Sequence, residues 1–522
     1  MTGFIITLLI IIYRIPLINL LGDKGMGYYS TALVIYLFVM TCIAYGLPNA
    51  VSSLIHIYNK KRQYDLVYKT IQCSFLYALI AGGAGTIIFF FGADFLSTHL
   101  MNATYSASAI QAFAPGLLFV TLLGALNGIY SGLRIPSVLN ASHLIEHISI
   151  ITFSLILTYV FTRSEATTGE FYCAAGAVLG ISAGIFIAFV FAFTKYSKYH
   201  KKLRKLAVKT SDTKGAKKSD IIRNIIITMV PFILTFTLFH LSCLLDYAVF
   251  NRIMSVQGHK ENSYIILLGM LNGKYEFFIS IPILIVYHFI SSKVPFMIRI
   301  INEGNKRKIH TKISQCVRYC MLFIIPWTVI YLLYANPLMN LFFHGSNDIP
   351  ALILRSGAVS IIFYSLALIS NSALTALEDW ASVAKNAMIS VVIQLSILLI
   401  MLVIFQWGIM ALIISRIVFS AFLFILNEHT LRERTGYVQE HKRTFHIPLT
   451  SSVIMGIVSL PLYLVLDLFL KDIIAVIIVI LIAVPVYIMS LVFLGGITQR
   501  EMYQIPGGKF LAPLCRKLHF NK

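Results

Sequence analysis

Charged residues are scarce in this chain of 522 amino acids: Asp, Glu, Lys and Arg together make up 12% of it, and only 21 residues are acidic. A soluble domain carries charge on about a quarter of its residues, so water is excluded as the main solvent of the folded chain. Apolar residues make up 58% and form long runs. A segment of about 20 apolar residues can cross a bilayer, and it must bond its own backbone polar groups, which predicts membrane-spanning helices.

Cysteine and the common catalytic motifs are also sparse or missing. The seven cysteines are an odd number, and most lie inside apolar runs, so no disulfide framework is predicted. No phosphate-binding Walker loop, dinucleotide fingerprint or Gly-x-Ser-x-Gly elbow occurs in the sequence. We therefore expect no enzyme, no ATP-driven pump and no cofactor, with sodium or protons as the only candidate coupling ions.

The apolar runs predict an all-α polytopic membrane protein with 14 transmembrane helices, of which the first two cover 3–21 and 28–57. Asn127–Leu133 has a counterpart in Asn371–Leu377, which indicates an internal duplication. Six spans in each copy predict two parallel, pseudo-symmetric six-helix lobes with a substrate cleft between them, followed by two C-terminal helices. The predicted parts are an N-terminal lobe over 1–194, a basic linker over 195–223, a C-terminal lobe over 224–427, a second linker over 428–446, helices 13 and 14 over 447–496 and a tail over 497–522.

The positive charges are placed unevenly along the chain. With the N-terminus inside, most of the 42 Lys and Arg residues fall on the cytoplasmic side, 11 of them in 195–223. Because cytoplasmic loops retain Lys and Arg, both termini are predicted to be cytoplasmic. The linker is expected to rest on anionic headgroups, and recruitment of an acidic partner is the alternative. Nucleic-acid binding is not expected, although the pI is about 9.6, because these charges adjoin membrane spans.

The N-terminal run reaches Tyr13-Arg14-Ile15-Pro16 without a small-residue cleavage site, so we expect a permanent helix rather than a signal peptide. The run is short for a span. Either the helix is tilted little, or the coding sequence starts upstream.

Ionisable residues inside the spans are few, and such residues usually face a bundle interior or an aqueous cavity. The basic ones are predicted to bind an anionic substrate in the cavity: Arg14, Lys274 and Arg416. The acidic ones are predicted to hold a cation or proton or to balance charge: Glu146, Asp246 and Glu276.

Each of these residues also has a structural interpretation. Arg14 could reach the membrane interface or pair with Asp23 or Glu146, and Arg416 could serve helix packing. His143-Leu144-Ile145-Glu146-His147 matches the H-x-x-E-H pattern of inverted zinc peptidases. The sequence offers no obvious third ligand, so no metal site is expected.

Several segments resemble a known family. They are Tyr13–Leu17, Leu20–Tyr29, Tyr45–Ser52, Gly128–Gly132, Leu144–Glu146 and Leu244–Asp246. Together with the 14-span count they resemble the stage V sporulation protein B-like proteins. These form part of the polysaccharide-transporter branch of the multidrug/oligosaccharidyl-lipid/polysaccharide exporter superfamily, alongside the lipid II flippases.

The chain also departs from that family's pattern at two places. It has Ala376-Leu377-Glu378-Asp379 where relatives commonly have Gly-Leu-Gly-Lys, and Gln394 where they often carry a charge.

The resemblance implies a monomeric flippase of the bacterial plasma membrane. It would move an undecaprenyl-linked sugar from the inner to the outer leaflet by alternating access, with lipid-linked sugar and membrane lipids as its partners. A drug/cation antiporter of the same superfamily, a membrane-embedded glycosyltransferase and a scaffold for envelope assembly are the alternatives. A positive cavity favours a lipid pyrophosphate, whereas a negative one favours drug cations.

Overall fold

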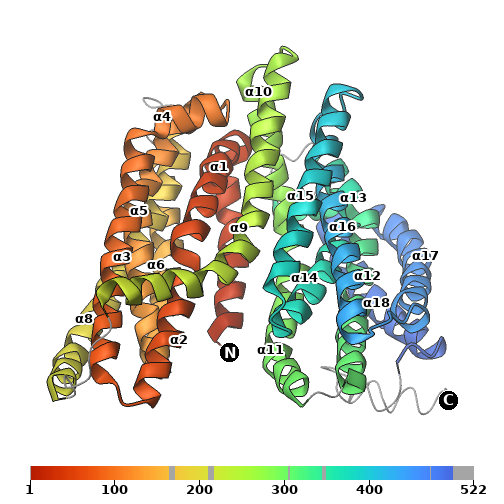
Figure 1. Cartoon of the computed structure of the whole chain (residues 1–522). Helices are drawn as coiled ribbons and strands as arrows, with labels where there is room; N and C mark the ends of the chain where they lie inside the picture. Colours follow the sequence, from red (N-terminus) through yellow and green to blue (C-terminus); the bar gives the residue numbers. More distant parts are fainter. Residues whose placement is uncertain are drawn as a thin grey trace. The chain divides into compact units, whose positions relative to one another are not determined.

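A computed structural model describes residues 2–163, 171–209, 217–303, 306–343, 348–470 and 472–497. Every regular element within these residues is helical (Figure 1), which confirms the all-α class. The middle of the predicted basic linker, 210–216, and the predicted tail from 498 onward lie outside the described residues.

The chain divides into two compact units, the first made of 1–273 and 395–412 and the second of 274–394 and 413–522. The first unit is built from α1 (Thr2–Met40), η1 (Thr41–Tyr45), α2 (Leu47–Lys60), α3 (Tyr64–Phe91), α4 (Ala93–Phe95), η2 (Leu96–Leu100), η3 (Thr104–Ser106), α5 (Ala107–Gly132), α6 (Pro136–Arg163), α8 (Phe171–Lys209), α9 (Lys218–Val256) and α10 (Glu261–Gly269).

The second unit contains α11 (Glu276–Asn302), α12 (Lys306–Phe342), α13 (Asp348–Gly357), α14 (Ser360–Ala376), η5 (Lys442–His446), α17 (Ile447–Asp467) and α18 (Asp472–Phe493). Three elements are divided between the units, namely η4 (Met270–Tyr275), α15 (Trp380–Val403) and α16 (Ile409–Thr435). The first unit thus extends beyond residue 194, and the predicted lobe boundaries stay a prediction.

Within the described residues, 11 helices are long and apolar enough to span a membrane, or 13 if each of two bent pairs is one span. The longest, Ile5–Lys60, covers both the first and the second predicted spans with 56 residues, whereas one crossing needs only about 20. Gly22 interrupts it with φ 64° and ψ 177°, a conformation that costs little only for glycine. The architecture of a multi-pass membrane protein is confirmed, but the count of 14 is not.

The two bent pairs change direction sharply. The parts of α9, Lys218–Leu234 and Phe236–Val256, meet at 53°, and α13 meets α14 at 45°. Pro231 lies in the turn before the bend of α9, where its missing N–H and bulky ring weaken the helix.

The predicted linker over 195–223 is largely helical at its ends, because α8 continues to Lys209 and α9 begins at Lys218. Lys, Leu, Arg and Ala are good helix formers, and the segment has no Gly or Pro before Gly215. The basic residues up to Lys205 therefore extend the preceding span rather than forming an irregular loop.

Small residues bring α6 and α8 into close contact. Gly176, Gly180 and Gly184 are spaced by four along α8 and face α6; a Cβ on Gly180 or Gly184 would overlap backbone atoms of Ser154 or Ile150. The Ser154 hydroxyl donates to the Ala177 carbonyl at 3.1 Å. Close backbone approach and interhelical hydrogen bonds are the usual way in which helices associate in lipid.

The two segments of the predicted duplication end in turns with similar backbone geometry, and the duplication itself stays a prediction. After α5, Arg134 has φ 59°, and after α14 Glu378 has the same value. The hydrogen bonds also correspond: Leu133 N–H bonds Ile129 O and Leu377 N–H bonds Ala373 O, both at 2.9 to 3.1 Å. Arg134 and Glu378 thus adopt the same left-handed cap, even though neither is glycine.

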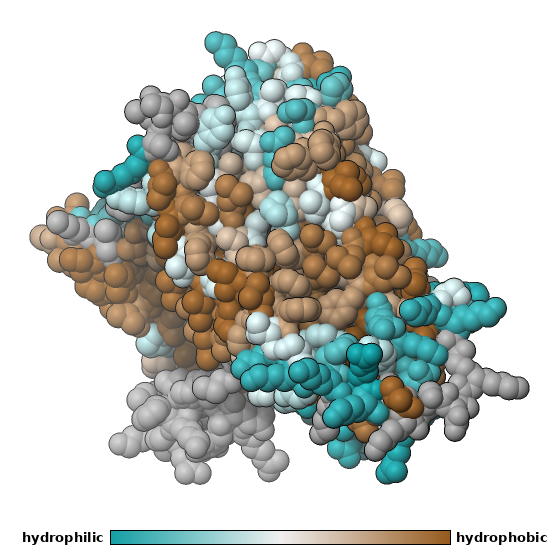
Figure 2. Space-filling model, turned by 90° about the vertical axis from the view of Figure 1, so that its left-hand side faces the viewer, coloured by the Kyte–Doolittle hydropathy of each residue, from teal (hydrophilic) through white to brown (hydrophobic). Residues whose placement is uncertain are grey.

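Apolar side chains cover the face of the first unit that Figure 2 presents, between hydrophilic ends above and below. Large apolar side chains exposed on α3, α6 and α8 include Ile80, Phe91, Val160 and Phe193. A continuous exposed apolar surface of this kind is unstable in water and matches the hydrocarbon layer of a bilayer.

Candidate functional site

In the first unit, Arg14 is held against η4. Its Nη2 donates to the carbonyl oxygen of Asn272 at 2.8 Å. This partner differs from the Asp23 or Glu146 carboxylate that the sequence suggested. Because η4 is a π-helical turn within a long helical segment, its altered backbone bonding leaves carbonyls for side-chain donors, and such turns often occur at functional sites.

The approach of α1 to α10 explains how Arg14 reaches η4. A Cβ on Gly27 would overlap the carbonyl of Ile265, and one on Gly269 would overlap the carbonyl of Asp23. Only glycine allows the two backbones to come so close. This packing fixes the position of the turn that follows α10.

Glu146 lies on α6 with its side chain 16% exposed, and its Oε2 is 3.5 Å from Nδ1 of His143. Tyr36 of α1 is near enough to interact with the charge of Glu146, and its ring stacks on Phe113 at 4.2 Å. Nδ1 of His147 is 2.9 Å from the carbonyl oxygen of His143. No group of three or more His, Cys, Asp and Glu that could hold a metal occurs in the residues that the structure describes.

Asp246 lies on the second part of α9 and is fully buried. One turn further, the side-chain amide of Asn251 donates to the carbonyl of Met101 at 2.8 Å, which attaches α9 to the end of η2. A carboxylate in this position is costly to keep charged unless it is paired, so its predicted role in charge balance stays a prediction.

In the second unit, Glu276 and Arg416 form an ion pair between α11 and α16, in which Nη1 of Arg416 donates to Oε1 of Glu276. Arg416 is 5% exposed and Lys274 is 4% exposed. Glu276 and Lys274 are two positions apart along the chain and therefore point in different directions. The ion-pair partner of Glu276 is Arg416, which is 140 residues away along the chain.

Tyr275 anchors the same turn in the second unit. Its hydroxyl is 3.0 Å from the hydroxyl of Ser360 and 3.4 Å from the carbonyl of Gly357, at the bend between α13 and α14. A Cβ on Gly357 would overlap the Tyr275 ring. Lys274 and Glu276 therefore flank a side chain that is firmly packed.

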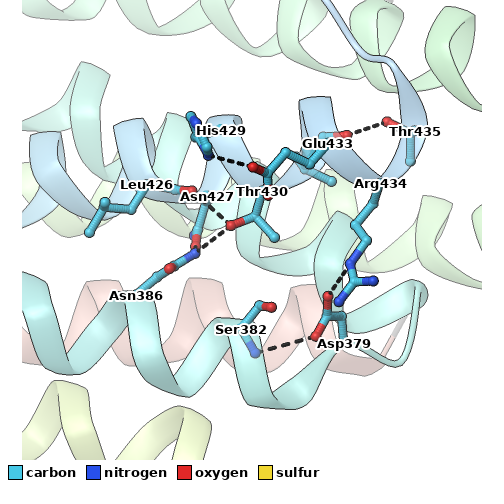
Figure 3. A network of polar contacts seen from close by, with 11 residues as sticks. Asp379, Ser382, Asn386, Leu426, Asn427, His429, Thr430, Glu433, Arg434 and Thr435 are labelled. Carbon is cyan, nitrogen blue, oxygen red and sulfur yellow. Dashed lines mark hydrogen bonds and ion pairs between the residues drawn. The ribbon is translucent and has the colours of Figure 1, made fainter.

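A polar network that the sequence analysis missed joins α14, α15 and α16, and Figure 3 shows its contacts between α15 and α16. The side-chain amide of Asn386 donates to Oδ1 of Asn427 at 2.9 Å and to Oγ1 of Thr430 at 3.1 Å. The amide of Asn427 donates to Oδ1 of Asn371 at 2.8 Å. Asparagines inside apolar runs could have indicated this network, because a polar amide within a membrane span needs hydrogen-bond partners.

Asp379, between α14 and α15, belongs to a second group of polar contacts (Figure 3). Its Oδ2 is 2.8 Å from Nε of Arg434, and its Oδ1 accepts the N–H of Ser382 at 3.3 Å. Burial raises the pKa of this carboxyl, but the hydrogen bonds from Ser382 and the charge of Arg434 outweigh it, so the pKa lies below the usual 3.8. Asp379, which stands where relatives commonly have the Lys of Gly-Leu-Gly-Lys, thus provides a carboxylate that pairs with Arg434.

The structure brings together some of the six predicted residues. In the second unit Glu276 pairs with Arg416, and in the first unit Arg14 donates to the Asn272 carbonyl. Glu146 and Asp246 lie on two further helices, α6 and α9. The roles of all six in substrate or ion binding stay predictions.

Residues 1–301 match the family model described as "Polysaccharide biosynthesis protein". The chain belongs to this family. The chain is 22% identical to the lipid II flippase MurJ of Bacillus subtilis (strain 168) over 473 residues, which cover 87% of this chain and 85% of that protein. It is 21% identical to stage V sporulation protein B of the same organism over 349 residues, covering 66% and 65%.

Solved structures show that this fold also occurs in proteins described as transporters and flippases. An inward-facing multidrug resistance MATE family transporter of the MOP superfamily aligns with a TM-score of 0.68 at 15% identity, over 83% of this chain and 94% of that one. Lipid II flippase MurJ in an inward closed conformation aligns with a TM-score of 0.65 at 14% identity, over 93% and 98%. The predicted family resemblance is confirmed, and the relatives whose names state a role are a flippase and a transporter.

Proposed function

We propose that this member of the polysaccharide biosynthesis protein family is a flippase. It moves an undecaprenyl-linked sugar from the inner to the outer leaflet of the bacterial plasma membrane by alternating access. The observation that carries the proposal is the burial of two cations within apolar helices of the second unit: Lys274 is 4% exposed and Arg416 is 5% exposed. The named relative MurJ is a lipid II flippase, which supports the same class of substrate.

The physical problem for such a flippase lies in the substrate's head. The polyprenyl tail is stable in lipid, whereas the pyrophosphate and sugar are very costly to move through hydrocarbon. A protein that shields the head and offers cations lowers this barrier. Arg14 is suited to bind two phosphate oxygens through its planar guanidinium, and Lys274 acts as a compact point charge.

Arg416 has a different part in this proposal. Its ion pair with Glu276 keeps a buried guanidinium neutralised in the absence of substrate. An incoming pyrophosphate competes with Glu276 for this guanidinium, and Glu276 is 33% exposed and able to take up a proton or a cation instead. Glu146 and Asp246 are the corresponding candidates in the first unit, and sodium or protons are the candidate coupling ions.

A flipping assay tests the proposal. Purified protein is reconstituted in vesicles with a fluorescent undecaprenyl-pyrophosphate sugar, and outward movement is measured by accessibility to an impermeant quencher. Arg14→Gln and Lys274→Gln are each expected to slow flipping about tenfold or more, because a hydrogen bond to a charged group contributes about 1.5 kcal/mol or more. Arg14→Lys keeps the charge and should retain part of the rate.

The matched control is Arg355→Gln, which removes an exposed arginine from the end of α13 and should leave flipping unchanged. Equal rates in the Arg14 and Lys274 variants and the wild type would overturn the proposed substrate-binding roles. Transport of a cationic dye in place of the lipid-linked sugar would favour the drug antiporter.

A further inference from the structure

An open pocket with a basic rim lies in the second unit where α11 ends and α12 begins. Its volume is about 700 Å³, and it is lined by Phe296, Arg299, Ile300, Glu303, Lys308, Thr311 and Lys312. The volume is within the range of small-molecule sites, about 300–1,000 Å³. We call it the basic pocket, and none of its residues is used by the proposed flipping mechanism.

The charge of the basic pocket favours an anion. Two cationic side chains contact the one carboxylate: Glu303 is 3.7 Å from Arg299 and 3.4 Å from Lys308. Lys312 is the third cation, and its Nζ is 3.0 Å from Oε1 of Gln315. The lining residues therefore carry a net charge of about +2. The first two turns of α12 supply Lys308 and Lys312, so the positive end of that helix dipole adds to the potential.

The same pocket also offers apolar surface. Phe296 is 47% exposed, and its ring lies 5.6 Å from the Lys312 ammonium. A narrow apolar crevice lined by Met297, Ile301 and Ile313 adjoins the basic pocket and shares Ile300 and Lys312 with it. A free phosphate would use only the cations. A ligand with a phosphate and a hydrocarbon chain would use both.

We propose that the basic pocket binds an anionic phospholipid of the surrounding bilayer. The headgroup phosphate is held by Arg299, Lys308 and Lys312, and the start of an acyl chain lies against Phe296 and the apolar crevice. The pocket is at the chain's predicted cytoplasmic side, where basic pockets between transmembrane helices bind anionic headgroups. The bound lipid would contact the end of α11 and the start of α12 at the same time.

The test uses the full chain in neutral detergent with dioleoylphosphatidylglycerol as the probe, and native mass spectrometry to measure retained lipid during titration. Each lysine near a headgroup contributes about 1 kcal/mol, or about fivefold in affinity. The double variant K308Q/K312Q is therefore expected to bind about 25-fold more weakly. K308R/K312R keeps both charges and should bind as the wild type does, which separates loss of charge from loss of fold.

Three further arms identify the ligand. Lys293→Gln removes an exposed lysine of α11 that does not line the basic pocket. This variant should leave lipid binding unchanged. Dioleoylphosphatidylcholine, with the same chains and no net charge, should be retained poorly, and millimolar inorganic phosphate should not displace the anionic lipid. Equal weakening by Lys293→Gln, equal retention of the neutral lipid or displacement by phosphate would each overturn the proposal.

Discussion

The ion pair between Glu276 and Arg416 is the residue-scale feature with the clearest energetic consequence. Arg416 is 5% exposed, so replacing Glu276 by Gln leaves a buried guanidinium without its carboxylate. Breaking a buried pair from one side costs about 3 kcal/mol or more. We expect Glu276→Gln to lower the melting temperature of the detergent-solubilised protein by several degrees, as followed by intrinsic fluorescence.

The double variant E276Q/R416M should regain much of that loss, because methionine fills a similar volume without a charge. Asp65→Asn is the control, since it removes an i,i+4 pair with Lys69 near the surface, which is worth only about 0.3–0.5 kcal/mol. A double variant as unstable as Glu276→Gln would show that the buried charge is not the cause.

Residue-scale prediction from the sequence was limited by distance along the chain. Arg14 and Lys274 could be selected because a charge inside an apolar run is unusual. The hydrogen-bond partner of Arg14 could not be predicted, because the Asn272 carbonyl is 258 residues away along the chain. Only the packing of α1 on α10 brings the two together. Asn386 and Asn427 were missed because neutral amides carry no charge signal, although they bond each other across two helices.

At the scale of elements, the glycines of α8 predict a steric test. Gly180→Leu would force a side chain into the backbone of Ser154, and such overpacking costs typically 1–3 kcal/mol, or more where backbone must move. We expect a lower melting temperature and less monodisperse protein in size-exclusion chromatography. Gly83→Leu is the matched control, because a Cβ there meets nothing within 4 Å; equal damage by both variants would contradict the close packing of α6 on α8.

The apolar runs predicted a multi-pass membrane protein because the thickness of the bilayer fixes how long each span must be, but the count of 14 is not confirmed. The lengths of the apolar runs did not predict where individual helices begin and end. The extension of α8 to Lys209 depends on helix propensity outside the apolar run. The π-helical turn η4 depends on tertiary contacts of α10 and could not be read from Met270–Tyr275 alone.

At the scale of the whole molecule, the net charge of +21 gives a prediction about topology. If positive residues mark the cytoplasmic side, Lys61→Cys should be inside and Val256→Cys outside. Both positions are exposed. In a background without the seven native cysteines, an impermeant maleimide should label Val256→Cys in intact cells and Lys61→Cys only after permeabilisation. The reverse pattern would invert the predicted orientation.

The whole-molecule class was predictable because it depends on composition, which needs no knowledge of contacts. Few charges and long apolar runs left only a polytopic helical protein, and the opening motif around Arg14 indicated the exporter superfamily. The division of the chain was harder to predict, since the first unit includes 224–273 and 395–412. These segments join it through contacts such as Gln257 with the Leu402 carbonyl, which no local pattern encodes.

The matching turns at Arg134 and Glu378 carry opposite charges on an identical backbone. The left-handed conformation at the end of a helix thus accepts a side chain of either sign, so the electrostatic potential beside such a turn can change while the direction of the chain is kept.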